Sequence, residues 1–597
     1  MGGWVRFGDD EENPEKAIFQ NFLRPAVEAG YGRYVTNLYN AYVYFWRWAL
    51  WKVFESEGAT GPGIVALITA SSYLRGPGFA GMRCHMRRTF DEIWVLDLGG
   101  EGRGAIKEEN IFAIRTPVAI AIGVRYGESN PETPAKVHYT RVRGNREEKL
   151  AALEAAENLL ASFAWQDVPS DWLAPFSPGL TTTYADWPSL SNIFPWQLPG
   201  AKYERTWPIA PTREVLKQRW QALVAEKDIE RRKLLFHENR DRKVLGKYPN
   251  LFSKKKKDSP IAELPADTPP PPIWRYSLRS FDRQWAFADN RLGSFLRPPL
   301  WQIWSARQIY LTTLLKGRLG PGLAATVTAH VPDLHHFSGR GGKDIIPLWR
   351  DRKGKKPNIT RGLLEVLSET YGQHVTAETL LAYTYALLAH PGYYETFQEE
   401  LEMSGPRLPL TKDSRLFFKA AALGQRLIWL HTYGERMGGG EEWPIQGRAR
   451  AIKPIPPDPN NYPTSFSYNA ETQTLQVGLG EFAPISQDVW EFEVSGLQVV
   501  RSWLAYRMKE PKGKRSSPLD DITQSAWTHE MTRELLELLW TLDASVDMWP
   551  AQAEVLETVI QNELFKASEL PQPTKEERKP PPKIELESDE KRNGKLV

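Results

Sequence analysis

Two stretches of the sequence gather basic side chains among aromatic ones. One contains Arg275, Arg279, Arg283, Arg291 and Arg297, and the other contains Lys343, Arg350, Arg352, Lys353, Lys355, Lys356 and Arg361. Such side chains bind phosphates, and arginine also reads guanine edges, so both stretches could contact nucleic acid. A solvated protein surface has the same composition, and these residues alone leave the two interpretations open.

Three further groups of residues fit chemical motifs only in part. The hexapeptide Phe337-Ser-Gly-Arg-Gly-Gly342 matches a glycine pattern that binds S-adenosylmethionine in many methyltransferases, but no buried strand precedes it, which favours a plain loop. His335 and His336 adjoin each other near Asp333, and adjacent histidines do not share one face, so we expect no metal site. Cys84 is the only cysteine, which excludes an internal disulfide and a Cys-cluster zinc site.

The composition is that of a folded, soluble protein. Hydrophobic residues make up 41% and charged residues 25% of the 597 residues, enough for three or four packed units. With 76 Lys and Arg against 73 Asp and Glu, the net charge is +3, which excludes binding to nucleic acid by overall charge alone. The N-terminus carries no secretion signal, and every apolar run is too short or too charged to span a membrane, so we expect a cytoplasmic protein.

Residues 1–135 are expected to form part of an α/β sheet. Apolar runs of strand length occur at residues 63–69, 91–98 and 118–125, and helical patterns occur at residues 37–55 and 79–90. Strands buried on both faces and separated by a helix are typical of a parallel sheet. The first 60 residues contain no glycine-rich nucleotide turn, which indicates the later part of a doubly wound sheet.

The rest of the chain is expected to form four segments. Residues 136–270 form a mixed connector with helices at residues 146–163 and 212–238, and the lysine run 254–257 with the proline run near residues 266–273 is typical of a linker. Residues 271–510 form a mixed α+β unit, and residues 511–568 form C-terminal helices. The remaining residues, 569–597, are rich in Lys, Glu and Pro and form a disordered tail.

Short motifs in the first segment resemble, in their order, the later motifs of N6-adenine DNA methyltransferases. They are Asn37-Leu-Tyr39, Gly63-Ile-Val-Ala-Leu-Ile-Thr-Ala-Ser-Ser-Tyr-Leu74, Gly81-Met-Arg83, Ile93-Trp-Val-Leu-Asp-Leu98 and Glu109-Asn-Ile-Phe112, followed by the strand at residues 118–125.

A second series of motifs resembles the C-terminal specificity region of type ISP restriction-modification enzymes. Trp274-Arg-Tyr-Ser-Leu-Arg-Ser-Phe-Asp-Arg-Gln-Trp285 is similar to the Tyr-Arg-Pro-Phe-Asp-x-Arg-Trp block that opens this region, with Ser280 in place of proline. Later blocks follow in family order at residues 347–349, 383–394, 406–411, 429–431 and 494–507. The chain therefore resembles the C-terminal portion of a type ISP N6-adenine DNA methyltransferase.

This resemblance implies a partial Rossmann-like, class I methyltransferase sheet followed by a mixed α+β target-recognition domain. It implies that Phe112 stacks on the target base, that Asn37 and Tyr39 border the S-adenosylmethionine pocket, and that the two basic stretches bind double-stranded DNA. The family's glycine motif for S-adenosylmethionine and its Asn-Pro-Pro-Tyr catalytic motif do not occur in the sequence. A second polypeptide would have to supply both motifs before adenine N6 could be methylated.

Other interpretations remain open. The chain could be a non-catalytic DNA-binding specificity subunit, a truncated inactive methyltransferase, or an interaction protein that has kept the fold. At the level of residues, Asn37 also suits a helix N-cap, and Phe112 also suits a core position in the loop between two strands.

Overall fold

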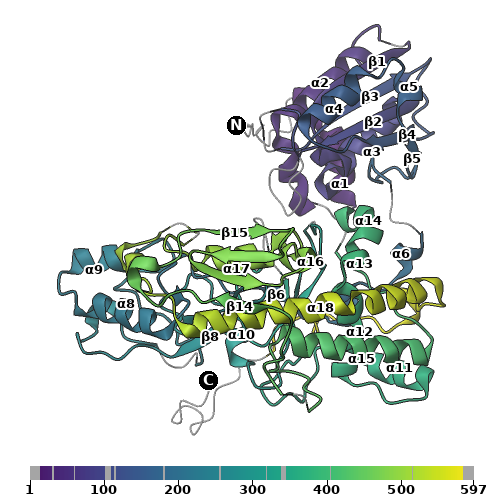
Figure 1. Ribbon diagram of the computed structural model, residues 1–597. Helices are drawn as coiled ribbons and strands as arrows, with labels where there is room; N and C mark the ends of the chain where they lie inside the picture. The colour runs from purple at the N-terminus through teal and green to yellow at the C-terminus, as the bar shows by residue number, and fades with distance from the viewer. Residues whose placement is uncertain are drawn as a thin grey trace. The chain divides into compact units, whose positions relative to one another are not determined.

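The computed structural model describes most of the chain as two compact units, Met1–Thr181 and Thr182–Val597 (Figure 1). The described residues are 14–29, 32–59, 61–100, 109–112, 114, 116–178, 182–253, 257–317, 319–337, 344–403, 405–440, 442–511, 513 and 515–581. The two units differ from the five expected segments, because the expected boundary after residue 135 falls inside the sheet of the smaller unit.

The larger unit is a mixed α+β fold made of several small sheets and helices. Its strands pair in the orders β11-β10-β13-β6, β12-β8-β9-β7, β14-β17-β16-β15 and β18-β19. The strands are β6 Leu198–Pro199, β7 Ile209–Ala210, β8 Ile273–Arg279, β9 Asp282–Phe287, β10 Tyr310–Thr313, β11 Thr326–Thr328, β12 Val331–Pro332, β13 Asp344–Pro347, β14 Arg450–Lys453, β15 Phe466–Asn469, β16 Thr474–Val477, β17 Gly480–Ala483, β18 Glu493–Val494 and β19 Leu497–Gln498.

Helices connect and cover these sheets. They are α6 Thr182–Asp186, α7 Leu190–Ile193, α8 Arg213–Ala225, α9 Ile229–Phe236, α10 Pro298–Gln302, α11 Leu363–Tyr371, α12 Ala377–Leu388, α13 Pro391–Thr396, α14 Gln398–Met403, α15 Ser414–His431, α16 Gln487–Trp490, α17 Val499–Ala505 and α18 His529–Gln561, with short 3-10 helices η4 Ile261–Glu263, η5 Pro459–Asn461, η6 Pro518–Asp521 and η7 Ala567–Glu569. The single helix expected at residues 212–238 is two, because Asp228 caps a new helix after α8.

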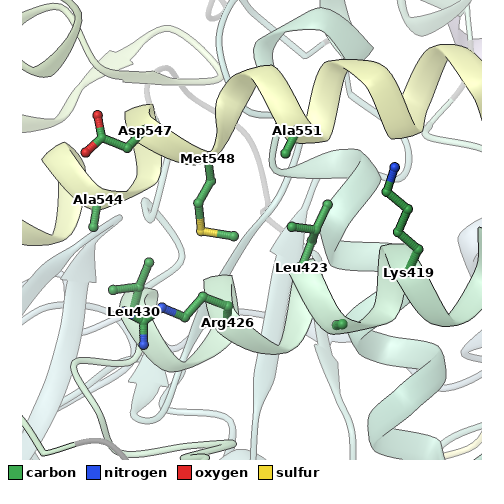
Figure 2. Close-up of a pocket in the computed structure, with 9 residues that line it drawn as sticks. Lys419, Leu423, Arg426, Leu430, Ala544, Asp547, Met548 and Ala551 are labelled. Atoms are coloured by element: carbon green, nitrogen blue, oxygen red, sulfur yellow. The ribbon is translucent and has the colours of Figure 1, made fainter.

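The long helix α18 packs along α15, which itself lies against α12. The contact between α12 and α15 is close because residue 424 is glycine, and a Cβ there would lie 1.8 Å from the carbonyl oxygen of Ala382. A hollow of about 540 Å³ opens between α15 and α18, with Met548 of α18 pointing toward α15 (Figure 2). Its lining is mainly apolar, and the ammonium of Lys419 at one end is paired with Glu554 at 2.7 Å.

The proline run does not form a linker between domains. Trp220 of α8 donates its indole N–H to the carbonyl of Thr268 at 2.9 Å, and Ala288 donates its backbone N–H to the carbonyl of Pro272 at 2.7 Å. The residues just before β8 are therefore a strap that hydrogen bonds hold on the surface of the larger unit. Proline has no N–H of its own, but its carbonyl accepts hydrogen bonds as any other does, which is why the run can be integrated.

Part of the expected tail is also ordered against the larger unit. Gln572 accepts the side-chain N–H of Asn192 at 3.1 Å, and the guanidinium of Arg578 donates to the carbonyl of Ser191 at 3.1 Å. The chain is packed as far as residue 581, and residues 582–597 lie outside the described part. Residues 569–581 are therefore not the disordered tail that the composition predicts, because hydrogen bonds hold them on the surface of the larger unit.

The smaller unit contains one five-stranded sheet of order β1-β3-β2-β4-β5. Its elements are α1 Pro14–Glu28, η1 Gly32–Tyr39, α2 Ala41–Phe54, β1 Gly63–Ala70, η2 Ser71–Leu74, η3 Pro77–Phe79, α3 Ala80–Thr89, β2 Glu92–Gly99, β3 Val118–Arg125, β4 Lys136–Arg141, α4 Arg146–Glu154, α5 Leu159–Ser162 and β5 Gln166–Asp167. The three expected strands and the helix after the first of them are confirmed.

The direction of one strand corrects the expected parallel sheet. β3 lies between β1 and β2 and is antiparallel to both, whereas β2 and β4 are parallel. β1 and β2 are thus parallel to each other and joined through α3, and β3 fills the place between them. A continuous apolar run marks a strand buried on both faces, but it carries no information on direction.

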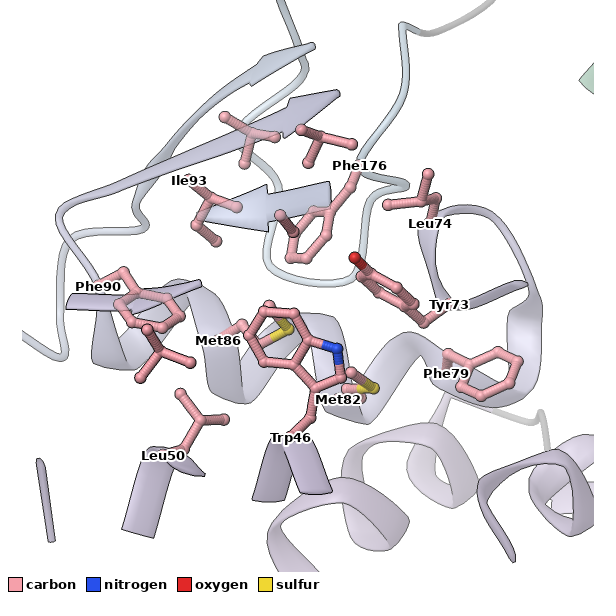
Figure 3. Packing of buried hydrophobic residues seen from close by; sticks show 14 of the residues in the cluster. Trp46, Leu50, Tyr73, Leu74, Phe79, Met82, Met86, Phe90, Ile93 and Phe176 are labelled. Atoms are coloured by element: carbon pink, nitrogen blue, oxygen red, sulfur yellow. The ribbon is translucent and has the colours of Figure 1, made fainter. Parts of the chain in front are cut away.

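The core of the smaller unit lies between its sheet and helices α1 to α3, where Trp46, Tyr73, Met82 and Phe176 converge (Figure 3). A Cβ on Gly81 would lie 1.9 Å from the carbonyl oxygen of Phe22, so only glycine lets α1 approach α3 this closely. Within the described residues of the whole chain, no helix combines the length and apolarity that a bilayer crossing requires.

Candidate nucleic-acid interface

The first basic stretch lies on the β8–β9 hairpin, and two of its arginines are committed to ion pairs. Arg275 donates to Glu534 of α18 at 2.7 Å and lies over the ring of Trp285. Arg283 donates to Glu537, one turn further along α18, at 2.9 Å. Both guanidinium groups are largely buried, so they hold the hairpin to α18 and are not presented to a ligand.

A fully buried ion pair lies behind these contacts. Asp282 and Arg507 are 2.8 Å apart, with exposed side-chain fractions of 1% and 0%. We call Arg275, Asp282, Arg283, Arg507, Glu534 and Glu537 the buried ion network. It contains three cations and three carboxylates, and longer contacts extend it from Arg283 to Glu435 at 3.9 Å and from Glu537 to Arg533 at 3.6 Å. Such pairing is the condition under which charges can be held inside a protein.

The other arginines of the first stretch differ in their surroundings. Arg291 forms a fork with the carboxylate of Asp289, at 2.6 Å for the shorter ion-pair contact, and is buried. Arg279 donates to the hydroxyl of Tyr506 at 2.7 Å and lines a hollow. Arg297 precedes α10, half-buried beside the ring of Phe295. The prediction that these residues bind DNA stays a prediction, and for Arg275, Arg283 and Arg291 the burial gives it no support.

Ser280, which replaces the proline of the resembled block, has a defined task. Its backbone N–H donates to the carbonyl of His336 at 2.9 Å, and its hydroxyl donates to the same oxygen at 3.0 Å. A proline at this position would remove the first of these two donors. The serine that replaces proline at position 280 is therefore used in local hydrogen bonding to His336.

The second basic stretch forms an exposed loop that presents lysines. The carboxylate of Asp351 accepts the backbone N–H groups of Lys355 and Lys356, each at 2.9 Å, which fixes the turn. Lys353, Lys355 and Lys356 are exposed on this turn. We call residues 350–357 the lysine loop; it carries five basic side chains and one acidic side chain, so its local charge is strongly positive.

The first residue of the lysine loop and a residue shortly after the loop contact the C-terminal segment. Arg350 donates to the carbonyls of Glu577 and Lys579 at 2.8 and 2.7 Å, and the backbone N–H of Arg361 donates to the Glu577 carboxylate at 2.8 Å. Arg352 is partly exposed and has a partner. Lys343 and the glycines of the hexapeptide after Phe337 lie outside the described residues.

In the smaller unit, Phe112 lies on the loop between β2 and β3 with 44% of its surface exposed. Asn110 shapes this loop, because its side-chain oxygen accepts the backbone N–H of Phe112 at 2.9 Å and its side-chain N–H donates to the carbonyl of Thr116 at 2.7 Å. The loop follows the carboxyl end of β2. Ligands of open α/β sheets bind at that edge, so an exposed aromatic ring is suitably placed there.

Asn37 and Tyr39 are brought to the same edge. They end η1, just before α2, and α2 packs on β1 after a short turn, which returns the start of α2 to the carboxyl end of β1. Asn37 is exposed and Tyr39 is half-buried. The N-cap of α2 is Asn40, so the expectation that Asn37 caps this helix is wrong.

A buried carboxylate supports this edge. Asp97, near the end of β2, accepts the hydroxyl of Tyr139 at 2.8 Å and the backbone N–H of Gly99 at 3.0 Å, and lies 3.4 Å from Arg75. Burial opposes ionisation, but the charges of Arg75 and Arg141 hold the pKa of Asp97 below its usual value. Asp97 therefore stays ionised and fixes the start of the loop that carries Phe112.

The later sequence blocks that resemble the specificity region form hydrogen bonds with one another. Tyr383 donates to the carbonyl of Pro409, and Tyr393 donates to the carbonyl of Arg407. His431 lies between the hydroxyl of Tyr385, which bonds its Nδ1, and Ser545, whose hydroxyl is 2.8 Å from its Nε2. Burial lowers the pKa of His431 to about 3. These aromatic motifs therefore build the scaffold of the larger unit.

A third basic run, which is not among the residues predicted from the sequence, contributes to a hollow. Residues 509–515, Lys509-Glu-Pro-Lys-Gly-Lys-Arg515, hold four cations in seven residues. Arg515 of this run, Lys202 and Arg279 line one hollow of about 500 Å³. The density of charge in the run could have identified it from the sequence as a candidate binding segment. Nothing in the sequence links it to Lys202, which lies 313 positions earlier.

The comparison with known families assigns the larger unit. Residues 192–538 match the family described as the Type ISP C-terminal specificity domain. Because this match covers more than half of the chain, the chain belongs to that family. The comparison with curated proteins returned no match.

Three solved structures of similar fold are complexes with DNA or with a DNA mimic. A nuclease-deletion mutant of the Type ISP restriction-modification enzyme LlaGI, in complex with a DNA substrate mimic, has 16% identity and a TM-score of 0.58 over 92% of this chain. The ATP-dependent Type ISP enzyme LlaBIII bound to DNA has 16% identity and a TM-score of 0.60 over 94%, and a DrdV–DNA complex has 19% and 0.59 over 87%. The chain spans 50%, 36% and 52% of these three proteins.

Breaking the Asp282–Arg507 pair should strongly destabilise the larger unit. We expect Arg507→Met to lower the free energy of unfolding by about 3–5 kcal/mol, because it leaves Asp282 charged and buried. Urea denaturation of the full chain, followed by tryptophan fluorescence, measures this. The control is Arg515→Met, which removes an ion pair of 2.7 Å that is 60% exposed on both sides and should cost less than about 1 kcal/mol. If the two variants lower the free energy of unfolding equally, burial does not make the Asp282–Arg507 pair more important than a surface ion pair.

The buried neutral His431 should make the larger unit sensitive to acid. Its pKa is about 3 in the folded chain against about 6.5 when unfolded, so below pH 6.5 the unfolded state binds the additional proton. This contribution to stability is complete above pH 6.5 and falls by roughly 2–3 kcal/mol by pH 4.5. His431→Gln should flatten the pH dependence measured by urea denaturation, whereas His374→Gln, at an exposed position, should leave it unchanged. An unaltered slope in His431→Gln would refute this assignment.

Proposed function

We propose that the chain provides target recognition, together with part of the catalytic domain, for a site-specific adenine-N6 DNA methyltransferase of a restriction-modification system. The observation that carries the proposal is the Type ISP specificity-domain family of residues 192–538. The similar structures are complexes with DNA or a DNA mimic, which supports double-stranded DNA as the ligand.

The charge distribution supports DNA binding by loops on a rigid scaffold. The net charge of the chain is small, so affinity for phosphates must come from local concentrations of cations. The lysine loop is one such concentration, and Asp351 holds it in a fixed turn. Its lysines would position the duplex through phosphates and would carry no sequence information themselves.

The methyl-donor site is incomplete in residues 1–597. Asn37 and Tyr39 lie at the carboxyl edge of the sheet, where Gly99 ends β2 and Gly100 follows it, but the family's glycine motif ahead of Asn37 and its Asn-Pro-Pro-Tyr motif are missing from the sequence. The residues present do not make a site for S-adenosylmethionine on their own. Phe112 is proposed to stack on the extruded adenine once the missing parts are supplied, since base-modifying enzymes read an unstacked base between aromatic surfaces.

The sheet of the smaller unit offers a place for those parts. β1 is its terminal strand, and no described strand pairs with its outer edge. Ile64 and Ile68 of β1 are 63% and 44% exposed, and their cross-strand neighbours Val124 and Ile120 are only partly covered. Natural proteins rarely leave an apolar edge strand open, so we propose that a second polypeptide pairs with β1 and covers this face.

A second candidate function is a non-catalytic specificity subunit that binds DNA and leaves methyl transfer to another enzyme. The missing donor and catalytic motifs favour it. Reconstitution with the second polypeptide separates the two functions, because only the first proposal requires methyl transfer through this chain's own sheet.

The full chain should bind duplex DNA with an affinity that falls steeply with salt. We expect Lys353→Gln/Lys355→Gln/Lys356→Gln to weaken binding and to lower the slope of log affinity against log salt by about 2–3, since each phosphate contact contributes roughly 0.9. Fluorescence anisotropy with a labelled duplex measures both quantities. The control Lys217→Gln/Lys233→Gln/Lys419→Gln has the same net charge and should keep the wild-type slope. Failure of the wild-type chain to retain DNA at low salt would overturn the proposed function.

Methyl transfer should require a second polypeptide that carries the Asn-Pro-Pro-Tyr motif. Co-purification with the product of a neighbouring reading frame that encodes this motif, followed by transfer of labelled methyl groups to a duplex, tests this. Ile64→Asp should abolish co-purification, whereas Ile452→Asp, at an equally exposed strand position of the larger unit, should not. In the reconstituted enzyme, Phe112→Ala should lower the rate by roughly 5- to 150-fold, the worth of one stacked base.

Two outcomes would count against this arrangement. Micromolar binding of S-adenosylmethionine to the isolated chain, measured by calorimetry, would show that the donor site is complete without a partner. If Phe112→Ala and Phe112→Trp both keep the wild-type rate of methyl transfer, the ring does not stack on the target base and has a structural role only.

A further inference from the structure

A hollow of about 500 Å³ in the larger unit combines apolar walls with basic side chains. It lies between the β8–β9 hairpin, residues 202–219 and residues 506–520. Ile209, Leu278 and Tyr506 provide apolar surface. We call it the basic hollow, because Lys202, Arg205, Arg219, Arg279 and Arg515 all line it. Its size and mixed lining are those of a small-molecule site.

Two of these arginines are buried, and among the described residues neither has a carboxylate within ion-pair distance, although Glu204 acts on Arg205 and Asp520 acts on Arg219 at longer range. Arg205 donates to the carbonyls of Phe236 and His237 at 3.0 and 2.9 Å. Arg219 donates to the carbonyls of Trp207, Ile209 and Ile522, each within 3.0 Å. Burial lowers the pKa of each to about 10, so both remain charged at neutral pH. Carbonyl oxygens satisfy most of the N–H groups but leave the positive charge in place.

The acidic residues of the hollow are already engaged. Glu204 pairs with Lys202, and Asp333 accepts the hydroxyl of Tyr276 at 2.7 Å. Asp520 accepts the hydroxyl of Thr206 at 2.7 Å and the backbone N–H of Ser516 at 2.7 Å. Five cations and three carboxylates line the hollow, and a fourth carboxylate, Asp521, pairs with Arg515. One positive charge is left in excess, which favours an anionic ligand.

The rim supplies contacts that a ligand can take over. Arg279 lies over the ring of Tyr506, which is half-exposed. Arg515 is 60% exposed and pairs with Asp521 at 2.7 Å, a surface ion pair that contributes little and is readily exchanged. An aromatic ring beside exchangeable cations fits the two parts of a nucleotide, since a base stacks on the ring and a phosphate binds the cations.

We propose that the basic hollow binds one nucleotide unit of a DNA strand, with its phosphate at Lys202, Arg279 and Arg515 and its base against Tyr506. This inference rests on the proposed function, which makes DNA the source of the nucleotide. It adds a contact region to the lysine loop, through side chains of three separate segments. A free nucleotide has the same chemistry, and the experiment separates the two sources.

Arg515→Gln and Lys202→Gln test the proposal in the full chain. We expect each to weaken duplex binding roughly tenfold, the worth of one charge-assisted hydrogen bond, and to lower the salt slope by about 0.9. Arg533→Gln is the matched control, because Arg533 is 62% exposed and pairs with a glutamate, but it lies on α18 outside the hollow. Thermal unfolding of each variant verifies that the fold is retained.

Calorimetry with deoxyadenosine monophosphate distinguishes the source. One outcome is that the wild-type chain binds this nucleotide, that Arg515→Gln weakens this binding, and that the same variant keeps the wild-type affinity for duplex DNA. This outcome would support the site but assign it to a free nucleotide. Wild-type duplex binding that both variants retain with an unchanged slope, together with no nucleotide binding, would overturn the proposal and leave the proposed function standing. A wild-type chain that binds no duplex at low salt would instead remove the proposed function.

Discussion

The buried ion network ties three parts of the larger unit together. Asp282 and Arg507 are buried together, and such a pair is tolerated only when both partners stay in place and their neighbours are satisfied. The β8–β9 hairpin, the residue that follows α17 by two positions and the first turns of α18 each supply part of the buried ion network. None of the three can move independently without exposing or isolating a charge.

Because these core arginines are committed to ion pairs, the ligand contacts that we propose lie on loops. The lysine loop and the rim of the basic hollow both consist of side chains that leave a rigid base, which is the usual arrangement for recognition surfaces. Asp351 fixes one loop through backbone hydrogen bonds, and Asp520 fixes the other through Ser516. Each acidic residue therefore organises a basic surface without neutralising the side chains that extend from it.

Local features of the sequence were predictable, whereas pairings across the chain were not. The strands at β1, β2 and β3 followed from continuous apolar runs, and the lysine loop followed from its composition. The reversed direction of β3 did not follow, because a doubly buried strand has the same pattern in either direction. The buried role of Arg275 and Arg283 could not be predicted either. A dense run of arginines has the same sequence whether solvent counter-ions or the carboxylates of glutamates on a distant helix balance its charge.

The distance along the chain between these partners has a consequence for biosynthesis. Arg275 is translated 259 residues before Glu534, and Arg283 is translated 254 residues before Glu537. At about 5–20 residues per second, the hairpin emerges from the ribosome roughly 13–50 seconds before the helix that neutralises it. During that interval its guanidinium groups must remain hydrated, so the larger unit can close only after α18 has left the ribosome.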